Sequence, residues 1–367
     1  MLRLCLFAFA GLALTAISSP AMAHHPSGVS GTGTSGPIVT IPAATLEQGA
    51  FSAWSAFEYI AFDELSDATL AAAALNDEHV HSLATLESPS VGLSYGVTDR
   101  LMVSLQLPYV IRTGIREGEH AHEDDAAGAD HHDDDGHDHE QAMPEIIARG
   151  TSEGIGDLSL LGQYRFLGQG SGPRAALLFG VKTPTGATDE RDNQGELFET
   201  ELQPGSGSWD GLFGLAFSLG SGKWSLDSNL LYAAAGEGAQ DTNLGDRLHY
   251  NGAVSYRLIG AGQPLPAAHE HRQGDDHRHH AEQPETGGGL AVDAALEING
   301  EWQAEETISG ESDPNSGGNV VYLSPGVRLT ANAWSGFVSV GLPIVNDLNG
   351  EQSEAEYRLL GGGSLSF

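Results

Sequence analysis

The chain holds one cysteine, Cys5, in 367 residues. Cys5 lies inside the N-terminal signal predicted below and is lost with it, so the mature protein has neither disulfides nor a cysteine nucleophile. Beyond residue 23 no stretch approaches 18 consecutive apolar residues, which excludes membrane-spanning helices. These two absences leave a chain that is exported without thiols and cannot cross a membrane as helices.

Basic residues are also scarce, because 16 Lys and Arg stand against 50 Asp and Glu, for a net charge of −34. Such a surface excludes nucleic acid as a partner, since nucleic-acid binding needs a basic footprint. It can attract cations. A mean hydropathy of −0.20 is compatible with a membrane barrel, in which only every second residue of a strand faces lipid.

The first 23 residues have the three parts of a secretory signal. Arg3 supplies the positive charge, residues 4–17 form the apolar run, and Ala21-Met22-Ala23 is an A-x-A cleavage site. We expect residues 24–46 to be a flexible N-terminal segment.

From Phe51 onward the chain divides into alternating apolar segments of about ten residues, as strands of a membrane barrel do. The expected strands are residues 51–62, 89–97, 101–113, 154–167, 174–186, 208–219, 223–234, 247–259, 290–303, 319–331, 334–345 and 356–367. Four connections are tight: 98–100, 168–173, 220–222 and 332–333. If these lie in the periplasm, twelve strands bring both termini to the periplasmic side. The sequence thus predicts an all-β protein, a closed antiparallel transmembrane β-barrel over residues 47–367.

Two architectures share this alternation. In a soluble sandwich the apolar face packs inward, whereas in a membrane barrel it faces lipid and the polar face lines the lumen. The signal, the near-absence of lysine and the aromatic residues near strand ends favour the barrel. The last strand, residues 357–367, is amphipathic and ends in Phe367, as expected of a strand that engages the barrel-assembly machinery.

Carried through the strands, this register places charged side chains in the lumen. They are Asp157, Arg165, Lys182, Asp227, Arg247, Arg257, Asp293, Glu297, Arg328 and Arg358. Two roles fit such residues: ion pairs that tie the walls together and plug the barrel, or charged rings that set the selectivity of a pore.

Two histidine-rich insertions, within residues 114–153 and 261–289, interrupt the pattern and are expected to be disordered. Their histidines are His120, His122, His131, His132, His137, His139, His269, His271, His277, His279 and His280. Imidazoles beside carboxylates can bind Zn, Cu, Ni or Co, although no cofactor is required. A solvated acidic loop enriched in histidine by drift is the other interpretation. Between the first two strands, residues 63–86 predict a short amphipathic helix with His79 and His81 on its exposed side.

Several segments resemble a known family of outer-membrane proteins. They are Tyr95-Gly96-Val97-Thr98-Asp99-Arg100-Leu101-Met102-Val103, Leu107-Pro108-Tyr109, Gly154-Ile155-Gly156-Asp157-Leu158, Gln163-Tyr164-Arg165-Phe166 and Gly180-Val181-Lys182-Thr183-Pro184-Thr185-Gly186. The family is that of the MetA-pathway of phenol degradation. The resemblance implies a barrel for uptake or transport of small, often aromatic or hydrophobic, molecules, without a catalytic motif.

Three functions follow as hypotheses. The first is an outer-membrane channel or transporter for small solutes, linked to transition-metal handling through the histidine-rich loops. The second is a barrel-anchored surface protein that sequesters metal without transport, and the third is uptake of aromatic or hydrophobic molecules. A barrel enzyme is not expected, because the only adjacent His/Ser pair, His81-Ser82, lies in a loop. The expected partners are outer-membrane lipid and a small-molecule or metal-ion substrate.

Overall fold

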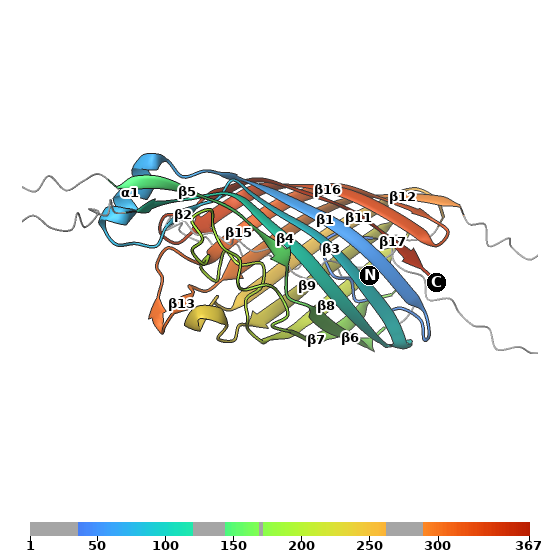
Figure 1. The fold of residues 1–367 in the computed structure, drawn as a ribbon. Coiled ribbons are helices and arrows are strands. Elements are labelled where there is room, and N and C mark those ends of the chain that lie inside the picture. Colours follow the sequence, from blue (N-terminus) through green and yellow to red (C-terminus); the bar gives the residue numbers. More distant parts are fainter. Residues whose placement is uncertain (1–35, 120–143, 169–171, 262–288) are drawn as a thin grey trace, which may run out of the picture.

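The computed structural model describes residues 36–119, 144–168, 172–261 and 289–367. Within them, twelve antiparallel strands close into a barrel (Figure 1). The strands are β1 Phe51–Asp63, β3 Thr85–Thr98, β4 Leu101–Glu119, β6 Ser159–Leu167, β7 Arg174–Lys182, β8 Asp210–Ser221, β9 Trp224–Ala234, β11 Arg247–Ile259, β12 Leu290–Gln303, β15 Gly318–Ala331, β16 Trp334–Leu348 and β17 Glu354–Ser366. Pairing of β4 with β6 and of β1 with β17 completes the ring. The fold prediction is confirmed.

The apolar faces of the strands point outward. Val91 and Leu93 on β3 and Leu215 on β8 are each more than half exposed, whereas Ser90 and Ser94 on β3 are buried. Inside, the Ser94 and Ser104 hydroxyls are 2.8 Å apart across β3 and β4. A soluble sandwich would bury the leucines and expose the serines. The burial pattern therefore excludes the sandwich and assigns the outer face to lipid.

The two ends of the barrel differ in their connections. At one end β3 joins β4 through Asp99-Arg100, and β15 joins β16 through Asn332-Ala333. Phe51 and Phe367 exchange backbone hydrogen bonds at this short-turn end, and their rings stack with centroids 5.8 Å apart. Trp224 and Tyr256 add a second aromatic pair there. Since periplasmic turns are short in such barrels, this end faces the periplasm.

The long-loop end has its own structure. The helix α1, Asp67–Leu75, begins at Ser66, whose side chain accepts a hydrogen bond from the Thr69 N–H, and it buries Leu70 beside Val80. The strand β2, His81–Ser82, pairs with the outer part of β4. The remaining short elements are η1 Ala239–Asp241, and β10 Thr242–Asn243, β13 Thr307–Ile308 and β14 Glu311–Ser312, which form a small sheet. None of the described helices is long and apolar enough to cross a membrane.

The predicted boundaries around the first histidine-rich insertion were wrong. The expected strand 154–167 is divided at residues 156–158 into β5, Glu145–Ile155, and β6, and both pair with β4. As a result, the described flanks of the first histidine-rich insertion, residues 114–119 and 145–153, form a hairpin of paired strands instead of a disordered loop. Backbone pairing that extends beyond the membrane leaves no hydropathy signal, which is why the sequence missed it.

Candidate functional site

A segment of the chain crosses the inside of the barrel. Residues 36–48, called the arch below, precede β1, and Ile38, Thr40 and Ala43 within them are fully buried. The sequence predicted a flexible segment for residues 24–46. Its described part, residues 36–46, is instead held against the lumen wall by hydrogen bonds, which is a correction to that prediction.

Glu297, at the middle of β12, holds the start of the arch. Its carboxylate accepts hydrogen bonds from the N–H groups of Ile38, Val39 and Thr40, the last at 2.8 Å, and from the Thr40 hydroxyl at 2.8 Å. Successive N–H groups that converge on one carboxylate satisfy both a buried charge and backbone donors that have no strand partner. Hydrogen bonding to Glu297 thus fixes the backbone path of the arch.

Polar side chains of other strands continue this support. The Asn229 Oδ1 accepts from the Ile41 N–H at 2.9 Å, and the Ser218 Oγ accepts from the Ala43 N–H at 2.8 Å. The Gln163 Nε2 donates to the carbonyl oxygens of Pro42 and Ala44. The contacts come from β6, β8, β9 and β12, so the arch spans the lumen from wall to wall.

The two ends of the arch are bound by arginines of the barrel wall. The Arg328 Nη2 donates to the Pro37 carbonyl at 2.7 Å, and the Arg165 Nε donates to the Thr45 hydroxyl at 3.3 Å. Close to Arg328, a Cβ on Gly326 would lie 2.4 Å from the Ile38 side chain, so only glycine leaves room for the arch there. Both arginines were expected to face the lumen, and the structure places them there as supports of the arch.

Beyond the arch, toward the long-loop end, the lumen contains a cavity of about 120 Å³. Its lining combines apolar side chains, such as Val110 and Leu231, with the charged groups Asp157, Lys182 and Arg247. A second cavity of about 30 Å³ shares Leu231 and His249 with the first and reaches Val39 of the arch. The arch therefore forms part of the floor of a charged, partly apolar chamber.

Lys182 is the centre of the charged wall of this chamber. Its Nζ lies 2.8 Å from the Asp210 Oδ2 and 3.4 Å from the Asp157 Oδ2, and it donates to the Ser206 hydroxyl at 2.6 Å. The Arg247 Nη2 lies 3.7 Å from the same Asp210 oxygen. Two cations and two carboxylates thus form a compact network rather than a ring of one sign.

The β7–β8 connection, residues 183–209, covers the chamber. Asp157 accepts hydrogen bonds from the N–H groups of Gly186 and Ser206, both at 2.9 Å. The buried Arg112 donates to the Gln203 carbonyl at 3.0 Å from below. Residues 183–209 therefore fold into the mouth of the barrel, and the strand expected over residues 174–186 ends at Lys182.

The other predicted lumen residues also lie inside the barrel. Arg257 pairs with Asp293 through a hydrogen bond of 3.2 Å and a second, shorter one. Arg358 donates to the Asn299 Oδ1 at 2.9 Å and stacks on the Tyr322 ring. Asp227 is fully buried and accepts from the Ser218 hydroxyl at 2.6 Å. Most of these charges are tied to the walls, as the ion-pair interpretation expected.

Sequence reasoning missed three groups of the lumen. Glu58 lies 3.9 Å from Arg358, Asp210 joins the network around Lys182, and Arg112 supports residues 183–209. Each lies on the polar face of an alternating strand or at its end, so the alternation itself was a usable signal. The histidines proposed as metal ligands lie outside the described residues.

The prediction that His81 is exposed was wrong. It belongs to β2 rather than to the helix, is 8% exposed, and lies among glutamates. Its neighbour Ser82 is buried and accepts a hydrogen bond from the Leu65 N–H at 3.0 Å. The pair that sequence reasoning considered for an enzyme is therefore part of the loop structure.

The closed barrel, its lipid-facing apolar surface and its filled lumen define an outer-membrane β-barrel protein of a Gram-negative bacterium. The model of the family described as "Putative MetA-pathway of phenol degradation" matches residues 109–307, more than half of the chain, and the chain belongs to this family.

The solved structures include similar barrels. An outer-membrane channel from Pseudomonas putida F1 is 15% identical with a TM-score of 0.51, and the match covers 89% of this chain and 98% of that one. The β domain of the Bordetella autotransporter BrkA is 10% identical with a TM-score of 0.43, over 88% and 100% of the two chains. No curated protein matches the chain.

Proposed function

We propose that the protein is an outer-membrane channel for small solutes, whose route passes through the chamber between the arch and residues 183–209. The chamber inside the lumen is the observation that carries this function. A purely structural barrel would fill the same space with side chains, as small barrels do. The family relationship and the likeness to a channel fold support the same conclusion.

The chamber favours a solute with an apolar body and a polar group. Val110 and Leu231 offer apolar contacts, while Lys182 and Arg247 offer charge-assisted hydrogen bonds. An apolar cavity of about 150 Å³ holds a benzene molecule, so a chamber of similar size fits a single ring. Small aromatic acids and alcohols are therefore the substrate class that we propose.

Transport through this route requires the arch to move. The arch has no strand partner, and apart from its connection to β1 its wall contacts are noncovalent. A pair of cysteines, Ala43→Cys with Ser218→Cys, tests this directly, because the Ala43 N–H already bonds the Ser218 hydroxyl. The mature chain is expected to lack other thiols.

The measurement is conductance in planar bilayers together with permeation of benzoate into protein-containing liposomes. We expect the oxidised double-cysteine variant to lose both, and a reductant to restore them. Each single-cysteine variant is the matched control and should resemble the wild type. The channel would be contradicted if neither the wild-type protein nor a variant without the arch passes ions or benzoate.

Transition-metal handling is a second proposed role. The two histidine-rich segments connect β4 to β5 at the long-loop end and β11 to β12 at the short-turn end, so histidine-rich sequence follows a barrel strand at each end. Calorimetry with Zn²⁺ or Ni²⁺ on a variant lacking residues 120–140 and 264–282 tests it. Equal binding by the variant and the wild type would exclude the segments as ligands. Metal binding without conductance would indicate a sequestering surface protein.

A further inference from the structure

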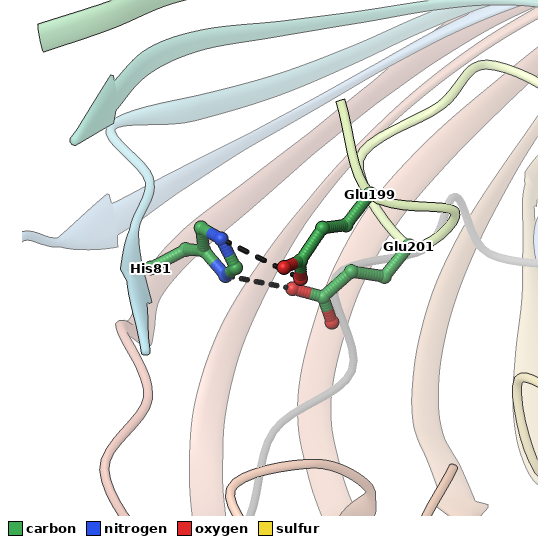
Figure 2. A group of neighbouring side chains, drawn as sticks. All are labelled: His81, Glu199 and Glu201. Atoms are coloured by element: carbon green, nitrogen blue, oxygen red, sulfur yellow. Dashed lines mark ion pairs between the residues drawn. The ribbon is translucent and has the colours of Figure 1, made fainter. Parts of the chain in front are cut away.

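A second charged site lies outside the lumen route, among the loops of the long-loop end. His81 of β2 lies between Glu199 and Glu201 of the β7–β8 connection (Figure 2). The His81 Nδ1 is 3.1 Å from the Glu201 Oε1, and its Nε2 is 3.6 Å from the Glu199 Oε2 and 3.0 Å from the Glu117 Oε2. The outer cluster, as these four residues are called here, joins three separate segments of the chain.

The geometry of the outer cluster suits a metal ion. One ligand atom from each of His81, Glu199 and Glu201 lies within 4.8 Å of the other two. Bonds of about 2.0–2.2 Å place the ligands of one zinc ion roughly 3–4 Å apart, so small side-chain rotations close the difference. The His81 side chain is only 7% exposed, so the surrounding residues restrict the orientation of its imidazole before an ion binds.

A further buried carboxylate points to the same cation. Glu306, in the loop after β12, is 3% exposed, and among the described residues its carboxylate has no hydrogen bond or ion pair. Burial and the nearby charges of Glu201, Asp313 and Glu199 raise the pKa of Glu306 to about 9. A cation bound in the outer cluster would offset the repulsion that Glu199 and Glu201 exert on the ionised form of Glu306.

The cations around the outer cluster do not balance its carboxylates. Arg149 is the main neighbouring cation, and it already binds Glu117 and three other acids. Its charge is therefore shared among four acids. Glu199 faces the imidazoles of His79 and His81, and Glu201 faces His81 and the charge of the buried Arg112. This excess of negative charge distinguishes the outer cluster from the balanced network around Lys182.

From this arrangement we infer that His81, Glu199 and Glu201 form a binding site for a divalent transition-metal ion of the zinc class. One imidazole and two carboxylates leave a fourth position for water, a donor set that zinc accepts and that Ca²⁺ and Mg²⁺, which take oxygen ligands, do not prefer. The ion joins β2 to the β7–β8 connection, close in sequence to Gln203 and Pro204, which line the chamber. The site goes beyond the proposed channel and does not depend on it.

Zinc titration of the full-length protein in detergent tests the inference. The histidine-rich segments would obscure one site, so the background variant carries Asn in place of each of their eleven histidines. We expect this background to bind one Zn²⁺ per chain, and excess Ca²⁺ and Mg²⁺ not to compete. X-ray absorption should show one imidazole and otherwise oxygen ligands.

Substitutions in this background assign the ligands. His81→Ala and Glu201→Gln should abolish the site. Glu117→Gln, which removes a contact to the imidazole and an ion pair with Arg149, should weaken it by about 10- to 100-fold. His249→Ala is the matched control, because His249 lies inside the barrel and pairs with one glutamate, Glu301, instead of three. Its zinc binding should equal that of the background.

Two results would overturn the inference. One is a background variant that binds no zinc. In that case the outer cluster consists only of ion pairs between protonated His81 and its glutamates. The other is zinc binding that survives both His81→Ala and Glu201→Gln. If either variant fails to fold, seen as loss of heat-modifiable mobility in gels, the absorption spectrum of the background still decides the ligand set. Conductance of the same proteins reports on the channel separately.

Discussion

At the short-turn end a single stretch of backbone crosses the lumen, whereas at the long-loop end charged side chains of several loops cover it. The arch is held mainly through its own N–H and C=O groups, which have no ionisable state. The cover depends on acids and a histidine, with Arg149 alone facing four carboxylates. In the proposed channel, we expect opening at the first end to require movement of a segment and opening at the second end to respond to charge.

Removing the arch should have the largest effect on conductance of the changes considered. Deletion of residues 36–46 should leave the barrel closed, because the arch contributes no strand, and should raise single-channel conductance several-fold. Planar-bilayer recording checks this. Unchanged conductance would show that residues 183–209, rather than the arch, are the main barrier.

The sequence predicted the wall of the barrel and not what fills it. Alternation placed Arg165, Glu297 and Arg328 on the wet face, and the tight turns set the parity of the strands. The arch was missed because residues 37–44 read as a short apolar run without a strand partner. Its position depends on Glu297, more than 250 residues away in the chain. Contacts of that separation have no local pattern.

His81 illustrates the same limit at the other end. The sequence predicted a helix over residues 63–86 and placed His81 on its exposed side, but the helix ends at Leu75. The pairing of β2 with β4 then turns His81 toward Glu201, which comes from a connection 120 residues further along the chain. The residues of the outer cluster are therefore brought together by long-range strand pairing and loop contacts, which the local sequence does not reveal.

A smaller perturbation weakens the arch without deleting it. Glu297→Gln leaves one neutral acceptor oxygen where a carboxylate now accepts from three N–H groups and a hydroxyl. A hydrogen bond to a charged group contributes about 1.5–3 kcal/mol, so open events should become roughly tenfold more frequent or higher. Single-channel open probability is the measurement.

Glu301→Gln is the control for this substitution. Glu301 lies on the same face of β12 and pairs with His249 instead of the arch. Its open probability should stay within a few-fold of the wild type. Equal effects of the two substitutions would mean that lumen charge, and not support of the arch, governs opening.

The smallest expected effect is a pH dependence confined to the long-loop end, measured with a chelator present. Burial and nearby acids raise the pKa of Glu306 to about 9, so the closed loops are most stable below its unfolded value of 4.5 and lose stability as the pH rises toward 9. Glutamates also raise the pKa of His81 above 6.5, so its contribution is complete below 6.5 and is lost as the pH rises through the raised value. The His81 charge lowers the pKa of Glu199 to about 2, so that contribution is lost only in acid, from 4.5 downward. Stability falls below pH 4.5 through Glu199 and above it through Glu306, while the His81 contribution is constant up to 6.5, so the most closed state lies near pH 4.5.

Glu306→Gln isolates one part of this dependence, because its neutral amide imitates the protonated carboxyl at every pH. Hydrogen exchange of residues 183–209, taken as the ratio of wild type to variant at each pH, removes the intrinsic effect of pH on exchange. The ratio should be near one at pH 5 and rise a few-fold by pH 9.5, while peptides from the arch keep a ratio near one throughout. A rise of the same size in the arch would mean that the two ends open together, and the distinction between a backbone closure and a charge-dependent one would fail.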